Sequence, residues 1–170
     1  ATLEFARPFL VNNGQMSWVS SRFYLGNQTV FTNRGSITIT NSPDEVIPTT
    51  IDSFSAFENE AIYNEGSITV ADANATDVRV PVFNSGTVRV ERNRLWFVLA
   101  GGYSQTAGRT QLAGGNMEFG SPRFSLLGGE LTGSGTILGT GTLTNIGGTV
   151  SPGISPGRIN LTGRYIQQSG

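Results

Sequence analysis

Three residue types are missing from this 170-residue chain, which contains no cysteine, no histidine and no lysine. Without cysteine it can form no disulfide, no thiol nucleophile and no cysteine-ligated zinc site. Without histidine it lacks the usual general base and the commonest transition-metal ligand. Without lysine it can form no Schiff base. We therefore expect a protein that is not an enzyme, with no catalytic residue and no bound cofactor.

Charge is also scarce, since Asp, Glu, Lys and Arg together make up 14% of the chain, against about 25% in typical domains. The 11 basic and 12 acidic residues nearly cancel, leaving a net charge of −1. This balance offers no basic surface for nucleic acid. No apolar run approaches the roughly 20 residues of a membrane span. No basic segment precedes an apolar one as in a signal peptide, so we expect a mature secreted chain or a fragment.

Glycine, by contrast, is abundant, with 23 residues, and it recurs within a repeated unit. The unit reads apolar-x-Asn-x-Gly-(Ser/Thr)-apolar-x-apolar, and its successive copies lie about 20 residues apart, which is the spacing of a solenoid repeat. Clear copies surround Gly14, Gly35, Gly66 and Gly86, and weaker ones surround Gly108, Gly128 and Gly147. At Gly170 the chain ends in the middle of a further copy.

Each unit predicts one coil of a β-solenoid. The alternating apolar residues after the glycine indicate a short strand with one buried face. The Asn-x-Gly segment before them is typical of a turn, because both residues tolerate positive φ. We expect an all-β fold with a single domain over residues 1–170, built from about seven to eight stacked coils.

Stacking predicts which side chains lie above one another. The repeated asparagines should form a hydrogen-bonded amide ladder along the axis; they are Asn12, Asn33, Asn64, Asn84 and Asn145. The turn glycines should stack likewise; they are Gly14, Gly35, Gly66, Gly86, Gly108 and Gly147. Two inward columns should form the core, one of Met16, Ile37, Ile68 and Val88, the other of Trp18, Ile39, Val70 and Val90.

One interval is too long for a single coil, and we interpret residues 41–61 as an inserted acidic loop on one face of the solenoid. A contact surface is expected in two places. In the loop it would include Asp44, Glu45, Phe54 and Phe57. In the apolar segment 95–99 it would include the outward-facing Trp96 and Val98.

Residues 80–170 resemble the repeat of autotransporter passenger regions and related bacterial surface adhesins. The resemblance is carried by FNSGTV at 83–88, YSQTAG at 103–108, GGELTGSGTI at 128–137 and VSPGISPG at 150–157. It implies a right-handed parallel β-helix in a secreted or cell-surface protein, and it implies no catalytic residues. The chain stops within a repeat, which favours continuation or self-association.

These observations favour a structural module that self-associates into a fibre, sheath or matrix. A carbohydrate- or cell-binding adhesin domain that contacts surface glycans is the alternative. A polysaccharide-degrading enzyme or tailspike fragment is a weaker one, with acidic residues of the loop or Asp72 and Asp77 with Arg79 as its candidate residues. A single Ca²⁺ could bind at Asp44 and Glu45, or at Asp72 and Asp77.

Overall fold

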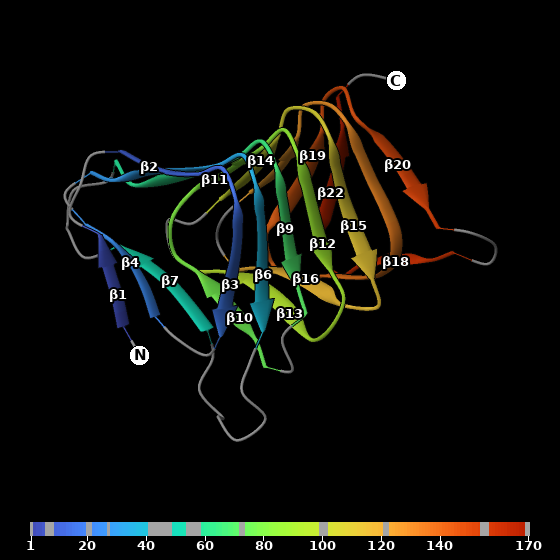
Figure 1. Ribbon diagram of the computed structural model, residues 1–170. Coiled ribbons are helices and arrows are strands. Elements are labelled where there is room, and N and C mark those ends of the chain that lie inside the picture. Colours follow the sequence, from blue (N-terminus) through green and yellow to red (C-terminus); the bar gives the residue numbers. More distant parts are fainter. Residues whose placement is uncertain are drawn as a thin grey trace.

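The computed structural model describes residues 2–5, 9–19, 22–26, 28–40, 49–53, 59–71, 74–98, 102–120, 123–153 and 157–168. Within these ranges every regular element is a β-strand. The chain coils about one axis as a β-solenoid, from the N-terminal end at the left of Figure 1 to the C-terminal end at the right. Each coil contributes one strand to each of three parallel sheets, here called A, B and C. The predicted all-β solenoid is therefore confirmed.

The strands of sheet A are β1 (Thr2–Phe5), β4 (Arg22–Leu25), β7 (Thr49–Ser53), β10 (Thr76–Val78), β13 (Arg94–Phe97), β16 (Asn116–Phe119) and β21 (Ile159–Leu161). Those of sheet B are β2 (Phe9–Asn12), β5 (Val30–Asn33), β8 (Ala61–Asn64), β11 (Val82–Asn84), β14 (Tyr103–Gln105), β17 (Phe124–Leu126), β19 (Thr142–Asn145) and β22 (Arg164–Gln167). Those of sheet C are β3 (Gln15–Val19), β6 (Ser36–Thr40), β9 (Ser67–Val70), β12 (Thr87–Val90), β15 (Arg109–Ala113) and β20 (Thr149–Pro152). The long β18 (Glu130–Gly139) continues from sheet C into sheet A.

The described strands make about six turns, slightly fewer than the seven to eight expected. The prediction counted repeated glycines, which mark corners, and corners at the two ends belong to incomplete coils. The right hand of the coil stays a prediction, supported by the strong preference of parallel crossovers for that hand.

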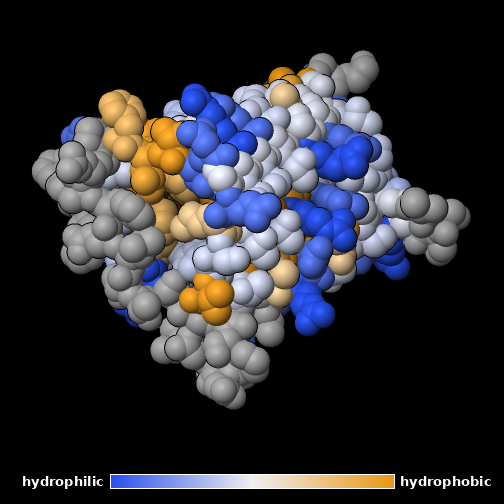
Figure 2. All heavy atoms as spheres, in the orientation of Figure 1, coloured by the Kyte–Doolittle hydropathy of each residue, from blue (hydrophilic) through white to orange (hydrophobic). Residues whose placement is uncertain are grey.

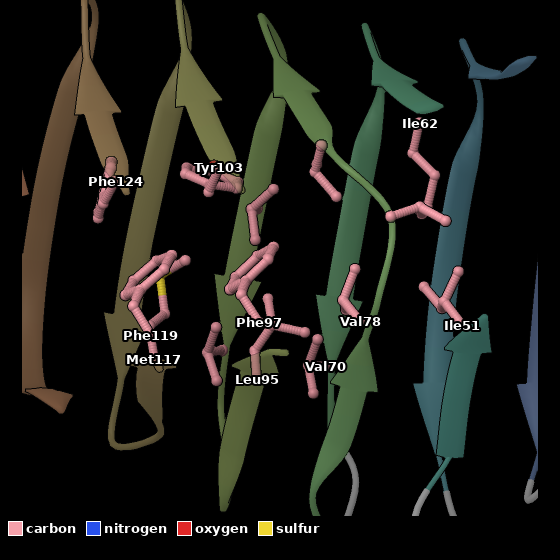
Figure 3. Close-up of a cluster of buried hydrophobic side chains, with 14 of the residues drawn as sticks. Ile51, Ile62, Val70, Val78, Leu95, Phe97, Tyr103, Met117, Phe119 and Phe124 are labelled. Atoms are coloured by element: carbon pink, nitrogen blue, oxygen red, sulfur yellow. The ribbon is translucent and has the colours of Figure 1, made fainter. Parts of the chain in front are cut away.

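The core is a set of apolar columns that run along the axis between the three sheets (Figure 3). Alternate residues of each strand face inward, so in-register stacking places like on like. In sheet A, Phe97 and Phe119 stack with their ring centroids 4.9 Å apart and their planes 3° apart. In sheet B, Tyr103 and Phe124 meet edge to face at 5.0 Å. Sheet C provides the two columns predicted from the repeat, and their pairing is in register.

The segment predicted as a single inserted loop contains a strand. Within residues 41–61, β7 pairs with β4 on one side and with β10 on the other. Its Ile51 is buried and Asp52 is half-buried. Only one apolar side chain of TTIDS faces the core, so the alternation that revealed the other strands is too short here to be seen. The insertion therefore consists of two connections, one on each side of a strand that belongs to the regular coil.

Candidate functional site

An amide ladder runs along the corner between sheets B and C. The Nδ2 atom of Asn12 donates to Asn33 Oδ1 at 2.8 Å. Asn33 donates to Asn64, and Asn64 to Asn84, each at 2.7 Å. All bonds run in the same direction, from one coil to the next toward the C-terminus. Asn33, Asn64 and Asn84 are fully buried, so these bonds replace the water that the carboxamides lose.

Each ladder amide also fixes the start of the following sheet C strand. The Nδ2 atoms of Asn33 and Asn64 donate to the carbonyl oxygens of Ser67 and Thr87, both at 3.0 Å. The same side chain therefore links its own coil to the next one at two points. The ladder sets the register of neighbouring coils at this corner.

The ladder is not continuous to Asn145. Two residues that the repeat did not reveal, Gln105 and Leu126, occupy the same column between Asn84 and Asn145. Gln105 Nε2 donates to the carbonyl oxygens of Gly128 and Glu130, at 3.2 and 3.1 Å. The first ladder ends at Asn84, whose Nδ2 donates to the carbonyl oxygens of Gly86 and Arg109, and the buried Leu126 has no amide to resume it. Asn145 begins a second, short ladder by donating to Gln167 Oε1 at 3.1 Å.

A buried polar network surrounds Gln105. Its Oε1 accepts from the hydroxyl of Thr110, which also lies 2.6 Å from the hydroxyl of Tyr103. Thr110 takes the place of an apolar residue in the column that begins with Met16. Burial raises the pKa of Tyr103 well above its usual range, and the hydrogen bonds from Thr110 and Asn84 oppose this shift. The network is a structural substitute for the asparagine ladder at this coil.

The turn glycines form a second column in which backbone touches backbone. A Cβ atom added to Gly35 would lie 1.9 Å from the carbonyl oxygen of Gly14, and one added to Gly66 would lie 2.1 Å from that of Gly35. The same carbonyl oxygens accept backbone hydrogen bonds from Ser36 and Ser67, both at 2.9 Å. Glycine is required here because a side chain would displace these bonds.

Two points of the glycine prediction are wrong. The strand register places Gly129 and Gly148 in this column, rather than Gly128 and Gly147. Each is one of two adjacent glycines, so the spacing alone could not assign the column. In addition, positive φ occurs in the column only at Gly108 (+64°) and Gly129 (+73°). At Gly35, Gly66 and Gly86 close approach of the preceding coil, rather than φ, excludes other residues.

The three outer faces of the solenoid differ in chemistry. Sheet C carries mainly Ser and Thr with an ion pair between Arg109 and Glu130 at 2.9 Å. The outer side of sheet A carries the charged residues Arg22, Asp52, Asp77, Arg94 and Glu118. The outer side of sheet B is apolar through its first coils, and it includes the stacked rings of Tyr63 and Phe83, whose centroids are 4.9 Å apart.

The outer face of sheet A brings together several residues that the sequence singled out. Trp96 lies beside Asp77 on one side and Glu118 on the other. The guanidinium of Arg94 lies 4.6 Å from the centre of the Trp96 ring and bonds to Glu118 at 2.6 Å. Trp96 and Val98 are half-buried, and the contact surface expected there stays a prediction. Asp44, Glu45, Phe54, Phe57 and Asp72 lie outside the described residues.

Asp77 is the most unusual group of this face, because it points outward from the sheet and is nevertheless 8% exposed. Its Oδ1 has no hydrogen-bond partner, and neither do Arg79 Nε and Trp96 Nε1 nearby. Burial raises the pKa of Asp77, while Arg79 and Arg94 oppose the shift. Arg79 bonds to Asp52 at 3.5 Å instead of to Asp77. In the described part of the chain no cluster of three acidic side chains forms around Asp77 to hold a metal ion.

No family model matches the chain, and no curated protein or solved structure is significantly similar to it. Within the ranges described above, no helix is long and apolar enough to cross a membrane.

The N-terminal end of the solenoid exposes the core. A groove of about 440 Å³ opens there, lined by Leu10, Val11, Asn12, Met16, Phe23 and Phe31 among others. Phe9 is 75% exposed and Val11 is 44% exposed. Figure 2 shows hydrophobic surface gathered at this end, where β2 lies in Figure 1. Within the described residues, β2 and β3 each pair with a neighbour on one side only.

The C-terminal end of the solenoid also exposes a core position. Tyr165 belongs to the inward column of sheet B that includes Tyr103, yet it is 44% exposed, whereas Tyr103 is 1% exposed. The difference arises because a further coil covers Tyr103 and none of the described strands covers Tyr165. On this side β20, β21 and β22 each pair with one neighbour.

Proposed function

We propose that the protein is a secreted or cell-surface structural module, of the autotransporter-passenger or adhesin type, that self-associates end to end into a fibre, sheath or matrix. The observation that supports this proposal is the concentration of exposed apolar side chains on the first and last coils. Among the described residues, four of the seven strongly exposed large hydrophobic ones lie on β2, β3 or β22; they are Phe9, Val11, Val19 and Tyr165.

Edge strands with apolar side chains favour pairing with another chain. A strand at the end of a ladder presents unpaired backbone donors and acceptors, and natural proteins commonly protect it with charge, proline or a covering segment. At β2 the opposite holds, since FLVN carries no charge and ends in the first amide of the ladder. Repeat proteins without polar capping coils tend to associate through their ends.

Sedimentation velocity over a range of protein concentrations, with electron microscopy of the same samples, tests this proposal. We expect rods whose length grows with concentration. Val11→Lys should block growth, because it places a charge on the exposed edge strand. Thr32→Lys is the matched control, since Thr32 is the next residue in the same outward column but lies one coil inside. A chain that remains monomeric at high concentration would overturn the proposal.

A second candidate function is glycan binding on the outer face of sheet B. The stacked Tyr63 and Phe83 rings offer an apolar platform to the C–H face of a sugar, with Tyr63 42% exposed. A shallow groove of about 280 Å³ beside Phe83 is lined by the hydroxyl residues Ser104 and Ser125 and by Arg123. Binding to immobilised glycans should be lost in Tyr63→Ala, whereas a deletion within residues 41–48, which retains β7, would leave it unchanged. The reverse result would assign binding to that segment.

The proposal includes no catalytic step. Acidic polysaccharides incubated with the protein, with and without Ca²⁺, should remain intact when analysed by size-exclusion chromatography. Release of oligosaccharides would favour the polysaccharide-degrading alternative.

A further inference from the structure

The amide ladder gives the solenoid a direction, and this direction restricts how two copies can meet. In Asn33, Asn64 and Asn84 the side-chain oxygen accepts the amide of the preceding coil. Asn12 begins the ladder, and its Oδ1 accepts instead from the backbone N–H of Gly14 at 3.2 Å. At the other end, Gln167 accepts from Asn145 and is the last amide of the column among the described strands. A ladder can continue only from Gln167 of one copy to Asn12 of another.

We propose that a second copy of this chain stacks on the C-terminal end so that its β2 pairs in parallel with β22, with Asn12 opposite Gln167. This inference rests on the proposed end-to-end association and specifies its surface and register. Head-to-head or tail-to-tail contacts would oppose two ladders of reversed direction and would pair the edge strands antiparallel.

The register is supported by the other residues of the two strands. Continuing each column of sheet B by one coil places Leu10 on Tyr165 inside the core and Val11 on Ile166 outside it. Leu10 lines the open groove and Tyr165 is the exposed end of the same inward column. The outward position beside them places the exposed Phe9 against the exposed Arg164, an arrangement suited to a cation–π contact.

A second pair of strands, β1 and β21 in sheet A, can meet in the same arrangement. The N-terminal coil contributes β1 to sheet A and β2 to sheet B at one level, and the C-terminal coil contributes β21 to sheet A and β22 to sheet B at one level. When β2 lies on β22, β1 therefore lies at the level directly above β21. The incomplete coils complement each other on two faces. On the third face, β3 and β20 lie two levels apart with no described strand between them, so the junction has a gap in sheet C.

Site-specific crosslinking tests the register, because the chain contains no cysteine. In the proposed junction Val11 and Ile166 are direct neighbours across parallel strands, about 4.8 Å apart, which is within the Cα separation that a disulfide bridges. Val11→Cys and Ile166→Cys proteins are mixed and oxidised, and the products are separated on a non-reducing gel. The heterodimer should be the main product. Each side chain points outward, so folding is preserved, and circular dichroism verifies this.

Two control samples give the outcomes that would overturn the inference. A mixture of Val11→Cys with Arg164→Cys should give little heterodimer, because a shift of two residues separates the Cα atoms by about 8 Å. If that pair crosslinks better, the register is wrong. If Val11→Cys alone forms the main dimer, the ends meet head to head. In both cases sedimentation still reports association, so the general proposal survives. Absence of association in the wild-type protein would overturn both.

Discussion

The side chain of Asn33 donates a hydrogen bond of 2.7 Å to Asn64, although 31 residues separate them in the sequence. Elsewhere in the first ladder the partners are 20 or 21 residues apart. The additional residues around β7 therefore leave the spacing of the coils unchanged at this corner. Register along the axis is carried by the corner amides and not by the length of the chain between them.

The ladder predicts that Asn64 is more important for stability than Asn12. Asn64→Ala removes the acceptor of Asn33 and the donor to Asn84, which leaves buried polar atoms unpaired. We expect a loss of about 2–4 kcal/mol in the free energy of unfolding, since each such group costs about 1–3 kcal/mol. Asn12→Ala, at the more exposed start of the ladder, should cost less than half as much. Urea denaturation followed by tryptophan fluorescence measures both, and equal losses would argue against a cooperative ladder.

The glycine column predicts a contrast between two identical substitutions. Gly66→Ala brings a methyl group to 2.1 Å from the Gly35 carbonyl oxygen, and the coils must move apart. We expect a destabilisation of about 1–3 kcal/mol or more, typical of overpacking. Gly14→Ala meets no atom within 4 Å and should leave the melting temperature nearly unchanged. A similar effect at both sites would show that backbone entropy, and not contact between coils, selects the glycines.

Asp77 predicts a pH dependence of folding stability. Its pKa is raised in the folded protein by burial, so the folded state binds a proton more tightly than the unfolded state. Stability is then highest below the unfolded pKa, falls as the pH rises from there to the folded pKa, and is constant above it. In Asp77→Asn the free energy of unfolding should fall less between acid and neutral pH than it does in the wild type. Thermal unfolding at a series of pH values checks this, and parallel profiles would contradict it.

The ion pair between Arg34 and Glu65 predicts a small effect. The two side chains meet at 3.0 Å, but they are 57% and 49% exposed. Exposed pairs of this kind contribute about 0–1 kcal/mol and are screened by salt. A double-mutant cycle with Arg34→Ala and Glu65→Ala should give a coupling energy in this range that decreases in 1 M salt. A larger coupling that resists salt would show that the pair is shielded from solvent.

The sequence was sufficient to predict the coil because each strand repeats a short alternating pattern at a fixed distance from Asn and Gly. Thr49–Ser53 could not be recognised as a strand, because Ile51 is its only apolar residue. The predicted inward columns are in register. At a later coil, however, Thr110 takes an apolar position in one column, and its buried hydroxyl is stabilised by hydrogen bonds with Tyr103 and Gln105 from another strand.

The corner residues were predictable as a set but not in their physical role. Asn and Gly were recognised as turn formers, whereas the structure uses Asn for hydrogen bonds between coils and Gly for close contact between backbones. Gln105 was not predicted, because the repeat has asparagine at this position. The longer amide fits there by donating to the carbonyl oxygens of Gly128 and Glu130, which the sequence does not reveal. The burial of Asp77 was likewise hidden, since it depends on neighbouring strands far apart in the sequence.

The glycine column has a consequence for how this chain can vary. Along that corner each residue is fixed by the backbone of the coil before it, so a change at one level must be accommodated by the next. The three outer faces are under no such restriction, and already differ in their polarity. Sequence changes can therefore give each face its own chemistry, while the glycine corner keeps the same backbone arrangement in every coil.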